Sequence, residues 1–389
     1  MPESSLLKES RITAVCHGVP PAAPESLGCG TPFSCFACGL VFLALMVVRT
    51  AGAQSAPELA CTQVQTPSRF DERMVGLDDA ITYAGPHEAL YEELLARSRS
   101  IVRIKDVRDN ASGSSLRFAQ LTGVLFGSKC HVVTNRHGVS VIAKERSGGY
   151  RLQDSPVVQV QRRPVLDLSK SPVGKVTATV EFGRASGRVV SVPAQVIHAE
   201  SMQSEDEVDG DLAVLRLDAP LQQAQLATFV PIDALRRPAS CTFPAATLGY
   251  PILPPRGRVP IVANRTELEI RGLSGELLVA DLSCGLRSCV AGNEACDDAI
   301  MKRAGFKRAL VSTCISAEGA SGSPLYVLAE RDRPLVAGLI TKTVSRSDPD
   351  ATESTWGIAV ARGFTQVELE RLQAVIKADI RDAGLVGCD

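Results

Sequence analysis

Three residues of this sequence could together perform nucleophilic catalysis. Ser321 lies in the glycine-rich stretch 318–324 (EGASGSP), between two apolar runs that are typical of strands. A serine hydroxyl is a poor nucleophile at neutral pH, so it needs a neighbouring base to take its proton and a third group to orient that base. His137 is the candidate base and Asp211 is the candidate acid.

The two partners occur in short stretches of their own. His137 follows an apolar run in 132–138 (VVTNRHG), and Asp211 precedes one in 209–217 (DGDLAVLRL). The order along the chain is therefore histidine, aspartate, serine. Because no histidine follows His198, the order of α/β-hydrolases, in which histidine comes last, is excluded for Ser321.

With these three stretches the sequence resembles trypsin/chymotrypsin-like serine proteases. The alanine before Ser321 and the phrase LGYP at 248–251 are closest to bacterial glutamyl-endopeptidase-like and HtrA-like proteins. The resemblance extends over roughly residues 100–384. It implies an exported serine endopeptidase that cleaves polypeptides through an acyl-enzyme, with no cofactor and no metal ion.

The resemblance also implies a role for each residue. Ser321 would attack the carbonyl, His137 would carry the proton to the leaving amine, and Asp211 would hold the imidazole in the correct tautomer. The backbone N–H groups of Gly319 and Ser321 would form the oxyanion hole, and a glycine at 319 permits the backbone angles that this requires.

Substrate selection depends on two further segments in this family. The floor of the primary pocket is set six residues before the nucleophile, which here is Ile315, next to Ser316. The strand beside the substrate would contain Thr341, Lys342 and Thr343. Because neither 315 nor 316 is acidic, we expect a small or apolar residue at P1 rather than arginine or lysine.

Departures from the family pattern keep other functions open. Gly138 stands where trypsins have a cysteine, and Ala320 cannot form the ion pair that a new N-terminus makes during trypsin activation. We therefore expect an active site that forms without insertion of the N-terminus. A protease-fold binding protein with little turnover is the alternative function, and an esterase on the same scaffold is a third.

The elements that must position these residues are mostly strands. Short β-type runs separated by turn residues predict an all-β barrel in each half. The first half contains runs at 101–104, 116–126, 130–134, 157–161, 175–182, 189–197 and 212–217, and the second contains runs at 245–249, 261–270, 276–282, 309–315, 325–328, 335–343 and 356–361. The resemblance implies two six-stranded antiparallel Greek-key barrels, chymotrypsin-like, with a C-terminal α-helix.

The chain divides into four segments on this interpretation. Residues 1–53 are a signal peptide or N-terminal leader, because 36–48 has the length of a signal-peptide apolar region and 51–53 (AGA) supplies a cleavage site. Residues 54–99 are an N-terminal extension with a short helix at 87–98. The first barrel occupies 100–225, and the second occupies 226–389 with a helix at 365–382, which begins with a capping box.

Composition and cysteines restrict the partners. Forty-two basic and 43 acidic residues give a net charge near zero, which predicts no nucleic-acid binding, and a membrane role only if the leader is uncleaved. The eight cysteines after residue 53 suit a secreted or periplasmic protein with disulfides. A zinc site at Cys284, Cys289, Cys296 and Cys314 is the less favoured alternative, and the sequence does not define an oligomeric state.

Overall fold

The structure is a computed structural model of the 389-residue chain. It describes residues 74–77, 87–110, 120–150, 159–183, 188–204, 207–235, 242–251, 278–290, 308–316, 319–329, 333–345 and 357–388. The expected leader at 1–53 with its cleavage site, the run at 261–270 and three of the cysteines (Cys61, Cys241 and Cys296) lie outside the described residues.

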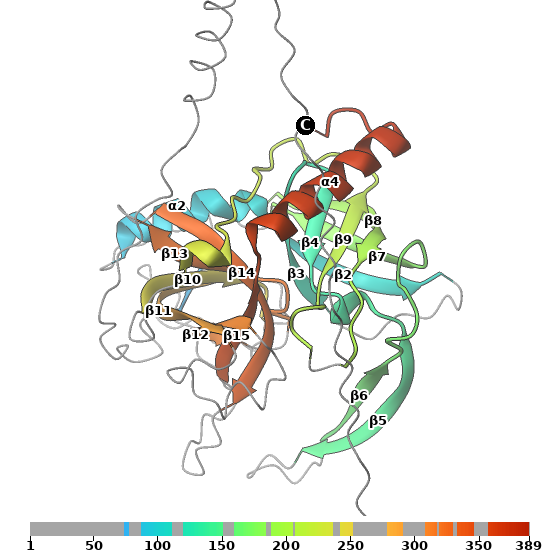
Figure 1. Cartoon of the computed structure of the whole chain (residues 1–389), viewed down its shortest axis with the longest axis horizontal. Helices are drawn as coiled ribbons and strands as arrows, with labels where there is room; N and C mark the ends of the chain where they lie inside the picture. The colour runs from blue at the N-terminus through green and yellow to red at the C-terminus, as the bar shows by residue number, and fades with distance from the viewer. Residues whose placement is uncertain are drawn as a thin grey trace, which may run out of the picture. The chain divides into compact units, whose positions relative to one another are not determined.

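Six strands of the N-terminal half close into a barrel. They are β2 (Ile101–Asp109), β3 (Gln120–Leu125), β4 (His131–Thr134), β7 (Val176–Phe182), β8 (Val190–Ala199) and β9 (Ala213–Leu217). The ring runs β2-β3-β4-β9-β8-β7, and all neighbours are antiparallel. Figure 1 shows this barrel on the side of the C-terminal helix.

Six further strands form a second ring. They are β10 (Phe243–Gly249), β11 (Val279–Val290), β12 (Arg308–Ser316), β13 (Pro324–Ala329), β14 (Arg333–Ser345) and β15 (Gly357–Gly363). Pairing of β11 with β12 closes the sheet order β11-β10-β13-β14-β15-β12. In both barrels the first strand pairs with the second and fourth, and the third pairs with the sixth. The predicted fold of two six-stranded antiparallel barrels is confirmed.

Apolar side chains fill each barrel separately. Alternate residues of β7 are buried over its first half, as expected for a strand with one face toward a core. One buried cluster, which includes Val102, Val132 and Leu215, fills the first barrel. A second, which includes Phe243, Leu310 and Ile340, fills the other barrel.

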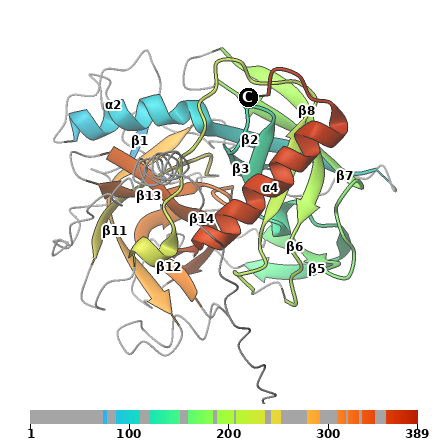
Figure 2. The ribbon, with the colours of Figure 1, turned by 45° about the horizontal axis from the view of Figure 1, so that its top comes forward.

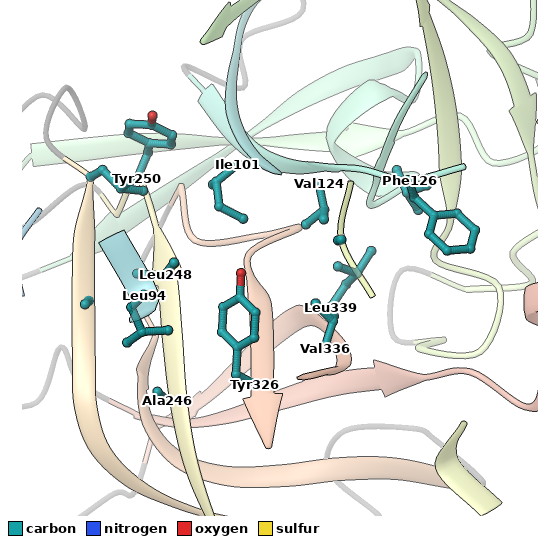
Figure 3. Packing of buried hydrophobic residues seen from close by; sticks show 14 of the residues in the cluster. Leu94, Ile101, Val124, Phe126, Ala246, Leu248, Tyr250, Tyr326, Val336 and Leu339 are labelled. Carbon is teal, nitrogen blue, oxygen red and sulfur yellow. The ribbon is translucent and has the colours of Figure 1, made fainter. Parts of the chain in front are cut away.

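A third cluster joins the barrels to both helices. Figure 3 shows Ile101 and Val124 of the first barrel facing Leu248 and Tyr326 of the second, and the N-terminal helix contributes Leu94 to the same cluster. All of these side chains are at most 1% exposed. The helix and the two barrels therefore share one apolar core, and that core fixes how the barrels face each other.

The two helices were predicted within a residue or two of their observed ends. Helix α2 (Glu88–Arg97) buries residues at helical spacing, and helix α4 (Gln366–Ala383) lies across the first barrel (Figure 2). The Thr365 side chain accepts from the Glu368 N–H and the Glu368 carboxylate accepts from the Thr365 N–H, so the predicted capping box is confirmed. Neither of these helices, nor any other in the described ranges, is long and apolar enough to span a membrane.

Two features were not predicted. Strand β1 (Met74–Gly76) lies in the N-terminal extension, for which only a helix was predicted, and it pairs with β11 over only three residues, too few to give a pattern. Strands β5 (Ile142–Tyr150) and β6 (Gln159–Leu166) form a separate hairpin. The run at 157–161 thus overlaps a strand outside the barrel, and β5 was missed because its glycines and charges break the alternation.

Two disulfides lie among the described residues. Cys130, just before β4, is bonded to Cys388 near the C-terminus, and Cys284 of β11 is bonded to Cys314 of β12. The expectation of disulfides is confirmed for these pairs. Because Cys284 and Cys314 are bonded to each other, they are not ligands of the alternative zinc site.

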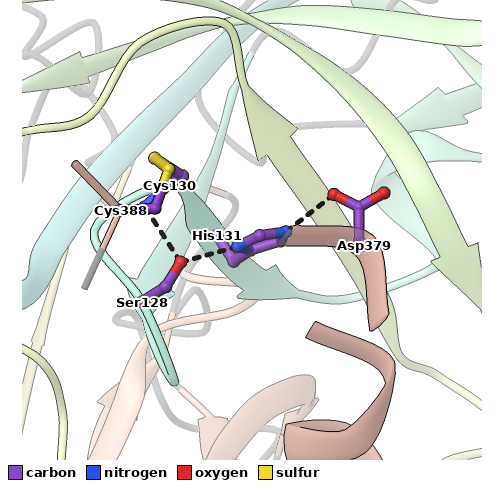
Figure 4. Close-up of a disulfide and its surroundings, with 5 residues drawn as sticks. All are labelled: Ser128, Cys130, His131, Asp379 and Cys388. Atoms are coloured by element: carbon purple, nitrogen blue, oxygen red, sulfur yellow. Dashed lines mark hydrogen bonds and ion pairs between the residues drawn. A yellow bond between two sulfur atoms is a disulfide. The ribbon is translucent and has the colours of Figure 1, made fainter. Parts of the chain in front are cut away.

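His131 lies in a buried polar network under α4, as Figure 4 shows. Its Nδ1 is 2.6 Å from Ser128 Oγ, and its Nε2 is 3.0 Å from Asp379 Oδ2 of α4. Arg216 Nη1 donates to the other oxygen of Asp379 at 3.0 Å. Burial lowers the pKa of His131 below its ordinary value of 6.5, and this effect outweighs the opposing influence of Asp379.

This network predicts a loss of stability in mild acid. The unfolded chain protonates His131 near its ordinary pKa, while the folded chain keeps it neutral, so stability is fully present above pH 6.5 and falls as the pH drops toward the folded pKa. We expect wild-type protein to lose more unfolding free energy between pH 7.5 and 5.5 than His131→Gln, measured by urea titration. Equal losses in the two proteins would contradict the assignment.

Candidate active site

The candidate base and acid come from neighbouring strands of the first barrel. Strand β4 ends at Thr134, and His137 begins the short helix η3 (His137–Val139) just after it. Asp211 lies two residues before β9. Because β4 and β9 are antiparallel, with Thr134 opposite Ala213, the end of one strand adjoins the beginning of the other. The topology therefore brings together residues that are 74 positions apart in sequence.

Asp211 holds the histidine through two hydrogen bonds. Its Oδ1 accepts from the His137 backbone N–H at 2.8 Å, and its Oδ2 lies 2.7 Å from His137 Nδ1. The aspartate is only 2% exposed, so both bonds lie away from water. Because a carboxylate only accepts, Nδ1 carries the proton and Nε2 is left as an acceptor.

Ser321 completes the arrangement from the second barrel. Its Oγ is 3.0 Å from His137 Nε2, within hydrogen-bond distance, and it lies on the loop between β12 and β13. The structure thus brings all three predicted residues together across the boundary between the barrels. The arrangement can transfer a proton from the serine hydroxyl to the imidazole while the aspartate orients that imidazole.

The loop around Ser321 has a backbone that favours glycine. Gly319 and Gly322 have φ angles of 87° and 83°, in the left-handed region that side chains disfavour. The Gly322 N–H donates to Ile340 O at 2.8 Å, and the Ser323 N–H donates to Ala320 O at 2.9 Å. Among the described residues, none accepts a hydrogen bond from the N–H of Gly319 or Ser321. These are the two N–H groups that the sequence analysis assigned to the oxyanion hole.

Thr122 of β3 fixes this loop, and sequence reasoning missed it. Its N–H donates to Ser321 O at 2.9 Å and its hydroxyl donates to Gly319 O at 3.1 Å. Its hydroxyl also accepts from the Tyr250 N–H at 3.0 Å, and its carbonyl accepts from the Thr134 hydroxyl at 2.7 Å. The sequence gives no signal that distinguishes Thr122 from Gln120, the other polar residue of this buried strand.

Replacing Thr122 should weaken both folding and catalysis. Thr122→Val removes the hydroxyl that donates to the Gly319 carbonyl and accepts from the Tyr250 N–H. We expect a loss of about 1–3 kcal/mol of unfolding free energy, measured by urea titration. Peptide hydrolysis should also fall, whereas Thr122→Ser keeps the hydroxyl and should stay close to wild type. Identical stabilities for the two variants would contradict this role.

The residues predicted to bind substrate lie on two strands of the second barrel. Ile315 and Ser316 end β12, opposite the first two residues of β15. The other three (Thr341, Lys342 and Thr343) lie on β14. Thr341 sits at an irregularity of the β14–β15 register, is 4% exposed, and donates its hydroxyl to a carbonyl of β15 at 3.2 Å. Its hydroxyl is thus used inside the barrel.

Comparison with solved structures finds proteases. The chain is similar to the Rv3671c protease of M. tuberculosis in an inactive form, with 16% identity and a TM-score of 0.37 over 75% of this chain and 96% of that one. It is also similar to the HtrA-type protease AlgW bound to a decapeptide, with 14% identity and a TM-score of 0.38. That match covers 74% of this chain and 67% of the AlgW chain. No family model and no curated protein matches the sequence.

Both TM-scores are low, so the fold is assigned from the order of strand pairing in the two barrels. The fold is that of trypsin-like serine proteases. In this protease fold Ser321, His137 and Asp211 meet between the barrels, and Thr122 ties the serine loop to the first barrel. The predicted resemblance is therefore confirmed at the level of the fold.

Proposed function

We propose that the protein is a serine endopeptidase that cleaves polypeptides through an acyl-enzyme. The observation that carries this proposal is the continuous hydrogen-bonded chain from Asp211 through His137 to Ser321, with distances of 2.7 and 3.0 Å. A serine in a glycine-rich turn is common, but one within hydrogen-bond distance of an imidazole that a buried carboxylate orients is an activated nucleophile.

Each step of the reaction uses an atom of this site. His137 Nε2 takes the hydroxyl proton as Ser321 Oγ attacks the carbonyl carbon, and it then returns that proton to the leaving amine. Asp211 stabilises the imidazolium that forms in between. Water then repeats the attack on the acyl-serine ester with His137 as base, which releases the acid and restores the serine.

The N–H groups of Gly319 and Ser321 are the proposed oxyanion hole. Both are buried or partly buried donors on a loop that Thr122 holds in place, so they stabilise the developing negative charge without rearranging. Removing one such donor typically costs about 2.7–4 kcal/mol of transition-state stabilisation.

Specificity and location form part of the same proposal. Ile315 and Ser316 at the end of β12 support a small or apolar P1 residue, with Thr341, Lys342 and Thr343 beside the substrate. A peptide library dominated by basic or acidic P1 residues would overturn this preference. The two disulfides support an exported protein, secreted or periplasmic. We retain 54–99, 100–225 and 226–389 as the proposed segments of the mature chain.

Labelling with a fluorophosphonate probe tests the proposal directly. We expect the purified protein to be labelled, and expect Ser321→Ala and His137→Ala to lose the label. Ser323→Ala is the matched control, because it removes a hydroxyl from the same loop two residues away and should keep the label. A folded wild-type protein that stays unlabelled would overturn the proposed catalytic function and favour a binding protein.

A further inference from the structure

Arg136, the residue before the candidate base His137, is a buried cation. It is only 3% exposed. Its guanidinium donates to three main-chain oxygens, from Nη1 to Glu200 O at 2.5 Å, and from Nη2 to Leu168 O at 3.1 Å and Lys170 O at 3.4 Å. The side chain therefore ties the turn that carries His137 to segments that lie 32 and 64 positions later in the sequence.

The same contacts reach the candidate acid. Glu200 accepts from Arg136 through its carbonyl, and its own N–H donates to Leu212 O at 3.0 Å, next to Asp211. Asn135, on the other side of Arg136, donates from Nδ2 to Asp211 O at 3.2 Å. The base and the acid are thus held together by main-chain contacts around Arg136 as well as by the bonds between their own side chains.

The charge of Arg136 is not cancelled by an ion pair. Within the described ranges no carboxylate oxygen lies within ion-pair distance of this guanidinium, and no atom accepts a hydrogen bond from its Nε. Burial lowers the pKa of Arg136, and the more distant carboxylates of Asp211 and Glu207 oppose that effect. An arginine stays charged in proteins, so a positive charge lies beside the His137–Asp211 pair.

Other charged or titratable side chains lie on the segments around the pair and on the strand proposed beside the substrate. They are Asp167, Lys170, His198, Glu200, Asp209 and Lys342. Asp167 pairs with Lys170 at 3.0 Å. Glu200 pairs with Arg362 of β15 at 2.8 Å. Burial lowers the pKa of His198, which favours its neutral form, and Asp209 and Lys342 have interactions of their own. Arg136 is therefore the charge next to His137 that no ion pair neutralises.

A positive charge at this place affects what His137 can do. It opposes protonation of the imidazole, because two positive charges repel each other. His137 Nε2 must be free of a proton to accept the one on Ser321 Oγ. Asp211 acts in the opposite direction, since it stabilises the imidazolium. The resting site thus contains one charge that favours the protonated base and one that disfavours it.

We propose that Arg136 is a positioning residue that anchors the turn carrying His137 and, through its positive charge, keeps that histidine in the neutral, proton-accepting form. The importance of Arg136 for hydrolysis rests on the proposed protease function. Its effect on the protonation of His137 does not, because that effect belongs to the resting site and needs no turnover.

An NMR titration of His137 tests the charge without catalysis. Ser321→Ala protein is prepared with histidine labelled with ¹³C at Cε1, and the His137 signal is the one lost in His137→Gln. We expect Arg136→Met to raise the titration midpoint of His137 by at least about 0.5 pH unit, because the repulsion is removed. Arg136→Lys keeps the charge, so its midpoint should stay within about 0.2 pH unit of the parent protein.

Labelling kinetics test the consequence for the serine. In proteins that keep Ser321, the rate of fluorophosphonate labelling is measured from about pH 5 to pH 9, and its acid limb reports protonation of the base. We expect the acid limb of Arg136→Met to move to higher pH by the same amount as the NMR midpoint. Arg136→Lys should keep the acid limb, although loss of the planar fork lowers the rate at its plateau.

Arg381→Met is the matched control, because it removes the same side chain from a site that is 76% exposed. Neither the titration of His137 nor the acid limb should change in this variant. If wild-type protein were not labelled at all, the proposed protease function would fail, and the NMR titration would still decide the role of Arg136.

Three results would overturn the proposal. The first is an unchanged titration of His137 in folded Arg136→Met, which would make Arg136 a structural anchor only. The second is an equal shift in the methionine and lysine variants, which would show that geometry and not charge sets the titration. Arg136→Gln, which still donates to a carbonyl, replaces Arg136→Met if the latter does not fold. In the third, neither charge-free variant folds, which would mean that Arg136 serves the fold itself.

Discussion

His137→Ala should lower kcat for peptide hydrolysis by about 10⁶-fold, which is nearly the whole contribution of the catalytic groups. His137 Nε2 is the proton acceptor next to Ser321 Oγ at 3.0 Å, and alanine leaves the hydroxyl with no base. KM should change little, because the side chain acts on the reacting proton and not on the binding of the peptide chain. Steady-state kinetics on a peptide substrate measures both constants.

Asp211→Asn should lower kcat by less than His137→Ala does. The amide cannot serve as the acceptor-only partner that holds the proton on Nδ1, so kcat should fall by about 10⁴-fold while the geometry is kept. His198→Gln is the matched control, since it removes a histidine that lies outside this hydrogen-bonded chain, and it should keep its activity. Hydrolysis by His137→Ala within about tenfold of wild type would show that this residue is not the base.

Local sequence patterns were sufficient to predict most of the elements. Short β-type runs bounded by turn residues predicted strands such as β7 and β8, and the Thr365 and Glu368 pair predicted the start of α4. These predictions succeeded because each depends only on residues within a few positions of one another. The candidate triad was found for a related reason, since each member lies in a short recognisable stretch next to a strand.

Features that depend on distant residues could not be predicted. Nothing near Thr122 indicates that it contacts the loop around Ser321, about 200 positions later, because those contacts exist only once the barrels meet. The pairing of Cys130 with Cys388, separated by 258 positions, is of the same kind.

Gly322→Ala should be among the most damaging single substitutions in this chain. A Cβ at this position would lie 2.0 Å from Thr122 O and 2.5 Å from Thr134 Oγ1, and the backbone is already at a φ of 83°. The clash is with a backbone carbonyl of the first barrel, which cannot rotate away. We expect a loss of about 3–5 kcal/mol of unfolding free energy, from backbone strain together with overpacking.

The same substitution should also reduce fluorophosphonate labelling of Ser321 by at least about 10²-fold, because the loop must move away from β3 and displace the serine from His137. Gly384→Ala is the matched control. Gly384 also has a left-handed backbone, with a φ of 62°, but no atom lies within 4 Å of a Cβ there, so strain alone should cost about 1–2 kcal/mol and labelling should be unchanged. The opposite result is that the two alanine variants lose the same unfolding free energy and both keep the label. That result would contradict the idea that close contact between the barrels at Gly322 positions Ser321.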